Sequence, residues 1–202
     1  MSWFDTRLFG ESFLTLVVIM DPPGTIPLFL SLTSGRPTRV RTRIAGQAAL
    51  VALLVIVLFA LFGQTVLDYL HVSLPALKCA GGLLLLLVAL ELLTGRADEP
   101  TAAADTNVAL VPLGTPLLAG PGAIVATMVF AQQVDGWGDA VSLGAGILAV
   151  HGLLWLSMRF SIGIIRVIKD SGVLLITRIS GLLLSAIAVQ LVADAVREFI
   201  AA

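Results

Sequence analysis

The chain has 202 residues, of which 58% are hydrophobic and only 12% are charged, whereas about a quarter of the residues in a soluble globular domain are charged. This composition excludes a water-soluble globule and indicates that a lipid bilayer is the solvent. The formal net charge of −1 gives no basic field that would attract nucleic acid, and the single Cys79 excludes an internal disulfide.

Six stretches are long and apolar enough to cross a membrane, which takes roughly 20 mostly apolar residues. In chain order they are residues 10–32, 44–66, 75–94, 108–132, 139–160 and 173–196. Because lipid offers the backbone no hydrogen-bond partner, each span is expected to be a helix. The charged N-terminal residues lack the small-residue cleavage site of a signal peptide, so we expect the first span to be retained. We predict an all-α, polytopic membrane protein with 1–202 as a single transmembrane domain.

Basic residues predict the orientation of these spans. With six spans, both termini share a side with the second and fourth connections. The opposite side carries nine of the 12 arginine and lysine residues: Arg36, Arg39, Arg41, Arg43, Arg96, Arg159, Arg166, Lys169 and Arg178. Cytoplasmic loops are enriched in these residues, so both termini are expected on the non-cytoplasmic side. Residues 164–169 are expected to lie along the membrane interface.

The two halves of the chain resemble each other. Pro23-Gly24-Thr25-Ile26 in the first span aligns with Pro121-Gly122-Ala123-Ile124 in the fourth, and Gly82 and its three leucines align with Gly181 and its three leucines at a shift of 99. Each unit holds three spans, an odd number, so the second must enter the membrane from the opposite face. We predict inverted repeats at about 10–94 and 108–196, joined by a polar cytoplasmic linker at 95–107.

Each repeat carries a proline-glycine break about halfway along its first span, at Asp21-Pro22-Pro23-Gly24 and at Gly120-Pro121-Gly122. Proline lacks an amide proton and glycine tolerates unwound backbone, so both spans are expected to divide into half-helices. Broken helices in corresponding positions of inverted repeats are typical of substrate sites in transporters. A simple proline kink is the alternative for either break taken alone.

A small zwitterion fits such a junction, because half-helix amides attract a carboxylate and half-helix carbonyls attract an ammonium group. We expect the amine near Asp21 and the carboxylate at the amides of Gly122 and Ala123. Alternatively, Asp21 is an N-cap of the second half-helix with Pro22 at its first position. The candidate substrate-binding residues are Asp21, Pro22, Pro23, Gly24, Thr25, Gly120, Pro121, Gly122 and Ala123.

Three ionisable residues inside spans are candidates for coupling or gating: Lys78, Glu91 and His151. Lys78 is also explained by its ammonium group extending to the outer interface, and His151 by a packing hydrogen bond. Glu91 is expected to pair with a cation such as Arg96. Gly81 and Gly82 are expected to permit close helix packing rather than to bind a ligand.

The chain resembles the MarC family, also called SnatA-like or UPF0056, within the broader LysE-type transporter group. The resemblance covers essentially the whole chain and is most specific at Pro116 through Ala123, with further matches at 21–27, 80–82, 89–93 and 181–190. It implies a bacterial inner-membrane protein with six spans and, as in characterised relatives, transport of small neutral amino acids such as glycine and alanine.

We therefore expect a transporter or exporter of small neutral amino acids that works by alternating access. A channel, or a scaffold that does not transport, is the alternative. The chain has no phosphate loop, metal-ligand cluster or nucleophile elbow, so we expect no enzyme, no cofactor and no metal. The expected partners are a small zwitterionic substrate and the lipid bilayer, not nucleic acid. A homo-oligomer is compatible with the sequence but not indicated by it.

Overall fold

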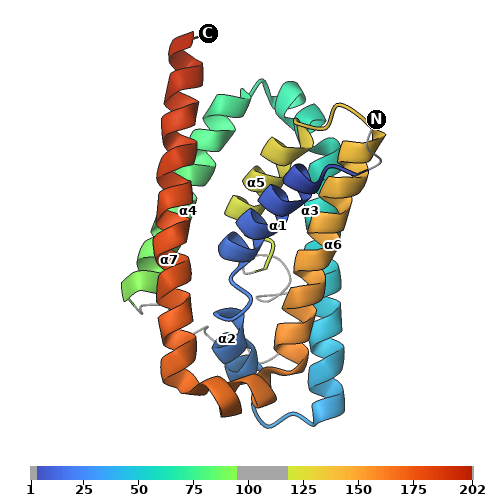
Figure 1. Cartoon of the computed structure of the whole chain (residues 1–202), viewed down its shortest axis with the longest axis vertical. Helices are drawn as coiled ribbons and strands as arrows, with labels where there is room; N and C mark the ends of the chain where they lie inside the picture. The colour runs from blue at the N-terminus through green and yellow to red at the C-terminus, as the bar shows by residue number, and fades with distance from the viewer. Residues whose placement is uncertain (1–3, 95–117, 202) are drawn as a thin grey trace.

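The computed structural model describes residues 4–94 and 118–201, and every regular element in them is an α-helix (Figure 1). The all-α prediction is confirmed. Four helices are long and apolar enough to span a membrane: α3 (Thr38–Leu70), α4 (Leu74–Thr94), α6 (Trp137–Arg159) and Ser171–Ala201 of α7. A fifth span results when α1 (Thr6–Met20) and α2 (Thr25–Leu32) are counted as one helix that is bent by 48°.

The predicted fourth span is represented by α5 (Pro121–Ala131), which is too short to cross a membrane alone. Its predicted first half and the linker at 95–107, with Arg96, lie outside the described residues. The described residues therefore hold four or five of the six predicted spans, and the six-span arrangement stays a prediction.

The ends of the long helices differ from the predicted ones for local reasons. Helix α3 begins at Thr38, directly after Pro37, and so includes three of the arginines that were assigned to the preceding connection. It ends where His71 adopts a left-handed conformation with φ 55°. Helix α7 (Ser161–Ala201) is interrupted at Lys169, with φ 60° and ψ 166°. Its first part runs across the direction of the remainder (Figure 1), as a segment along a membrane surface would.

The buried residues form two clusters. The larger one joins α1, α2, α3, α5 and α6, where the alanine-lined face of α3 at Ala45, Ala48 and Ala52 allows the neighbouring helices to approach. The smaller one lies between α4 and α7. Small residues dominate such contacts in membrane proteins because lipid provides no hydrophobic force between helices, so close packing must stabilise them.

Glycines set the contacts of α4 with its neighbours. A Cβ at Gly82 would lie 2.8 Å from the carbonyl oxygen of Ala188, and a Cβ at Gly181 would lie 3.2 Å from that of Ala89. A shift of 99 residues relates Gly82 to Gly181 and Ala89 to Ala188. The two contacts are therefore equivalent, with the glycine and the alanine exchanged between α4 and α7. A Cβ at Gly81 would likewise collide with Val125 of α5. The predicted packing role of Gly81 and Gly82 is confirmed.

Candidate functional site

The first predicted break is present between α1 and α2. Because Pro22 and Pro23 have no amide proton, the carbonyls of Val18 and Ile19 have no main-chain donor four residues ahead. Helix α1 ends at Met20, and its C-cap Asp21 has a left-handed backbone with φ 38° and ψ 68°. The chain re-enters a helix at Thr25, so the two prolines and Gly24 form the link.

Asp21 does not cap the second half-helix. It is the C-cap of α1, and its own amide donates to the carbonyl of Val17. The N-cap of α2 is Gly24, which makes no side-chain capping hydrogen bond. The predicted N-cap alternative is therefore wrong: with two consecutive prolines before it, α2 begins four residues after Asp21, too far along the chain for capping. Thr25 bonds locally, its Oγ1 donating to the carbonyl of Pro22 at 2.7 Å.

The Asp21 carboxylate is buried. The residue is 6% exposed, and neither carboxylate oxygen makes a hydrogen bond within the described residues. The Gly24 amide and the Ser180 hydroxyl approach it without reaching hydrogen-bond geometry. An ionised carboxylate removed from water is costly unless it is paired. Asp21 combines this burial with a left-handed backbone. For a residue other than glycine this conformation costs roughly 1–3 kcal/mol, and such strained residues tend to occur at functional sites.

Gly24 is needed for space rather than for an unusual backbone. Its φ of −67° and ψ of −24° suit any residue, which corrects our expectation that glycine supplies the unwound angles here. A Cβ at this position would overlap the Asp21 carboxylate and would lie 3.2 Å from Thr177 Oγ1. The carboxylate therefore folds back over Gly24 and points toward α7.

The second predicted break is described only on its C-terminal side. Leu118 and Ala119 form a turn, Gly120 is extended, and α5 begins with Pro121 at its first position. The amides of Gly122 and Ala123 lie in the first turn, where a helix provides no acceptor of its own. Both residues are buried, and a Cβ at Gly122 would overlap Leu85 of α4.

The helices that adjoin the two breaks pack against each other. Helices α1 and α5 contact each other, and Met20, Ala119 and Ala123 belong to the same buried cluster. Figure 1 shows the end of α1 beside the start of α5. The Asp21 carboxylate, however, approaches Thr177 and Ser180 of α7. We did not predict these two hydroxyls, although their spacing of three residues on an apolar helix was a usable signal.

The candidate coupling residues occupy separate places. Lys78 does not simply extend to the interface: its Nζ lies 2.5 Å from Glu198 Oε1 of α7, and its side chain is 13% exposed. His151 is buried, its Nδ1 lies 2.7 Å from the carbonyl oxygen of Ile147, and its Nε2 has no partner among the described residues. Glu91 is exposed, and its expected partner Arg96 lies outside the described residues.

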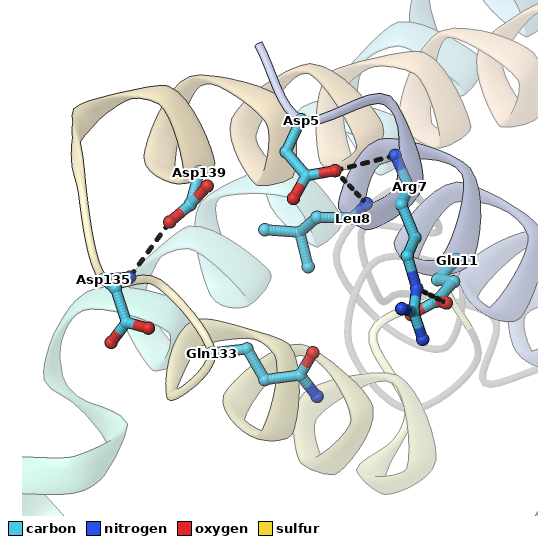
Figure 2. Close-up of a pocket in the computed structure, with 7 residues that line it drawn as sticks. All are labelled: Asp5, Arg7, Leu8, Glu11, Gln133, Asp135 and Asp139. Carbon is cyan, nitrogen blue, oxygen red and sulfur yellow. Dashed lines mark hydrogen bonds and ion pairs between the residues drawn. The ribbon is translucent and has the colours of Figure 1, made fainter. Parts of the chain in front are cut away.

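A polar depression of about 370 Å³ lies elsewhere, between the start of α1 and the α5–α6 connection (Figure 2). Its carboxylates serve local structure. Asp5 accepts from the amides of Arg7 and Leu8, Asp139 accepts from the amide of Asp135, and Glu11 pairs with Arg7. No group of metal-ligating side chains occurs in the part of the chain that the structure describes. We therefore place the candidate site at the α1–α2 break.

Comparisons of the chain with a family model and with known proteins point to the same family. Residues 6–200 match the model of the MarC family of integral membrane proteins. A UPF0056 membrane protein of Methanocaldococcus jannaschii is 36% identical over 200 residues, covering 96% of this chain and 98% of the relative. One from Aquifex aeolicus is 35% identical, covering 96% and 94%, and one from Escherichia coli is 27% identical, covering 97% and 95%. No solved structure matches the chain significantly.

Proposed function

This chain belongs to the MarC family of integral membrane proteins, and on that premise we propose that it is a secondary transporter or exporter of small neutral amino acids, such as glycine and alanine. The single observation that carries the proposal is the broken first span, where the Asp21 carboxylate is buried and has no hydrogen-bond partner within residues 4–94 and 118–201. Transporter sites are built from such interrupted helices at mid-membrane depth.

The substrate would lie between the two breaks. Its ammonium group would face Asp21 and the carbonyl end of α1, and its carboxylate the amides of Gly122 and Ala123 at the start of α5. Pro22, Pro23, Gly24, Thr25, Gly120 and Pro121 would form the surrounding links. The contact of α1 with α5 supports this arrangement. Glycines at both links favour a substrate with a short side chain, such as glycine or alanine.

Alternating access would come from one repeat moving against the other. The reciprocal contacts of Gly82 with Ala188 and of Gly181 with Ala89 support inverted repeats, because a pseudo-two-fold axis generates such paired contacts. These contacts lie between α4 of the first repeat and α7 of the second, so we propose that the two repeats rotate about this interface. The Lys78–Glu198 ion pair at one end of this interface and the buried His151 are candidates for gating or coupling, and Glu91 is a candidate at the other end of α4.

We further propose a bacterial inner membrane as the location, with both termini on the non-cytoplasmic side. The ends of the described chain lie at one end of the helix bundle, and the α2–α3 and α6–α7 connections lie at the other (Figure 1). Exposed arginines such as Arg36, Arg39 and Arg159 are at or near these connections. This asymmetry supports the orientation expected from the positive-inside rule.

The test is flux of labelled glycine and alanine in liposomes that contain the purified full-length protein, with and without a proton gradient. We expect saturable, stereoselective uptake. Asp21→Asn should lower it about tenfold or more, because a hydrogen bond to a charged group contributes roughly 1.5–3 kcal/mol. Asp68→Asn, which changes an exposed carboxylate, is the matched control. Non-saturable flux would instead indicate a channel, and absence of flux a scaffold.

A further inference from the structure

A second set of oxygens faces the Asp21 carboxylate from α7. A Cβ placed on Gly24 would lie 3.2 Å from Thr177 Oγ1 and would overlap Asp21 Oδ2, so the hydroxyl and the carboxylate border the same small space. Ser180, one turn further along α7, has its hydroxyl near the carboxylate. Both α7 residues are half-buried, so the carboxylate is enclosed by the link on one side and by α7 on the other.

The last turn of α1, directly before Asp21, contains main-chain oxygens without their usual donors. Val18 and Ile19 lack their usual amide donors because Pro22 and Pro23 occupy the positions four residues ahead. Carbonyls at a helix C-terminus also carry the negative end of the helix dipole. The hydroxyls of Thr177 and Ser180 and the carbonyls of this turn are therefore all able to present an oxygen to a cation.

The charge of this group of residues limits what it can hold. Asp21 is its one carboxylate, and the hydroxyls and carbonyls around it are neutral. A single negative charge among neutral oxygens suits a small monovalent cation, whereas divalent sites usually contain several carboxylates. Among the residues that the structure describes, neither carboxylate oxygen has a hydrogen-bond partner although Asp21 is only 6% exposed, so this carboxylate is able to accept a cation.

We propose that Thr177 and Ser180 of α7 complete an oxygen-lined site for a small monovalent cation around Asp21. The cation is either the ammonium group of an amino-acid substrate or a free sodium ion, since both are bound by the same donors. Occupancy joins the α1–α2 link of the first half of the chain to α7 of the second half. The bound cation thereby favours one arrangement of the two halves, which is how an ion can drive alternating access.

The experiment measures thermal unfolding of the purified full-length protein at constant pH and ionic strength, with no transport involved. Choline chloride provides the baseline, and sodium chloride, methylammonium chloride and glycine are titrated separately. We expect saturable stabilisation. Stabilisation by sodium identifies a free ion, whereas stabilisation by methylammonium or glycine alone identifies the substrate ammonium group.

Variants on α7 decide whether the two hydroxyls take part. Thr177→Val and Ser180→Ala should each weaken the apparent affinity about three- to tenfold, as expected for loss of one polar contact, and Asp21→Asn should abolish the effect. Ser185→Ala is the matched control, because Ser185 Oγ donates to the carbonyl of Leu182 and should leave the titration unchanged. Thr177→Ser and Ser180→Thr keep the hydroxyl and should restore near-normal affinity.

Two results would overturn the inference: no saturable stabilisation of the unaltered protein by any of the three solutes, or titrations of Thr177→Val and Ser180→Ala that match those of the unaltered protein. Cation binding does not depend on the proposed function, but its role in driving alternating access does. Intact cation binding without amino-acid flux in liposomes would contradict the transporter alone, and flux with no dependence on Thr177 or Ser180 would contradict the cation site alone.

Discussion

The contact between Gly24 and Asp21 predicts a strong energetic coupling between two residues of the α1–α2 link. In Gly24→Ala the new Cβ would overlap the Asp21 carboxylate, and overpacking of this kind costs about 1–3 kcal/mol. The backbone of Gly24 already has helical angles, so alanine also contributes about 0.4–1 kcal/mol of stabilisation by restricting the unfolded chain. The net expectation is a destabilisation of roughly 0.5–2 kcal/mol.

A double-mutant cycle isolates that contact. In an Asp21→Ala background the overlapping carboxylate is absent, so Gly24→Ala should become neutral or stabilising by up to about 1 kcal/mol. Gly10→Ala is the control within α1, since a Cβ there meets no atom within 4 Å. The free energy of unfolding is measured in one detergent by denaturant titration. An equal cost of Gly24→Ala in both backgrounds would refute the proposed position of the carboxylate.

Three further predictions concern helix packing and buried polar groups. Gly82→Ala should lower the free energy of unfolding by about 1–3 kcal/mol, because a backbone oxygen 2.8 Å from the new Cβ cannot move aside. Gly144→Ala, where the new Cβ would meet no atom within 4 Å, should be neutral or stabilising in the same denaturation assay. Glu198→Gln should destabilise the protein more than Lys78→Met. The first leaves the 13% exposed Lys78 ammonium group without its charged partner, whereas the second leaves the 40% exposed Glu198 carboxylate, which water can hydrate. Equal losses of stability would contradict this interpretation of the ion pair. Thr127→Val should be neutral or stabilising by up to about 1 kcal/mol, because the buried hydroxyl makes no hydrogen bond in the described part of the chain, and a loss above that size in thermal unfolding would reveal an unrecognised partner.

Much of the fold follows from local chemistry. Long apolar runs in lipid must form helices because nothing else there satisfies the backbone, and the helices α3, α4 and α6 and the later part of α7 lie close to the predicted ranges. Pro22 and Pro23 remove two consecutive amide donors, so the break after Met20 was predictable without any tertiary contact. The family was also recognisable from these motifs, and the family comparison agrees.

The side chains around the break could not be assigned in the same way. A helix such as α4, with leucines on every side, has no polar face to indicate its rotation, so the pairing of Lys78 with Glu198, 120 residues away, depends on how the helices pack. The same is true of Thr177 and Ser180, which α7 brings to Asp21. The N-cap role of Asp21 failed for a local reason, since Asp21 is the C-cap of α1 and α2 begins only at Thr25.

The amino-acid sequence by itself determined that this chain is a helical membrane protein whose first span is interrupted at Asp21, because hydrogen-bond satisfaction in lipid and the missing proline amides act over a few residues. Only the tertiary structure decided which oxygens gather around the buried carboxylate. Those positions depend on small-residue contacts between distant helices, such as Gly82 with Ala188 and Gly122 with Leu85, which determine how closely the helices approach and which face each one presents.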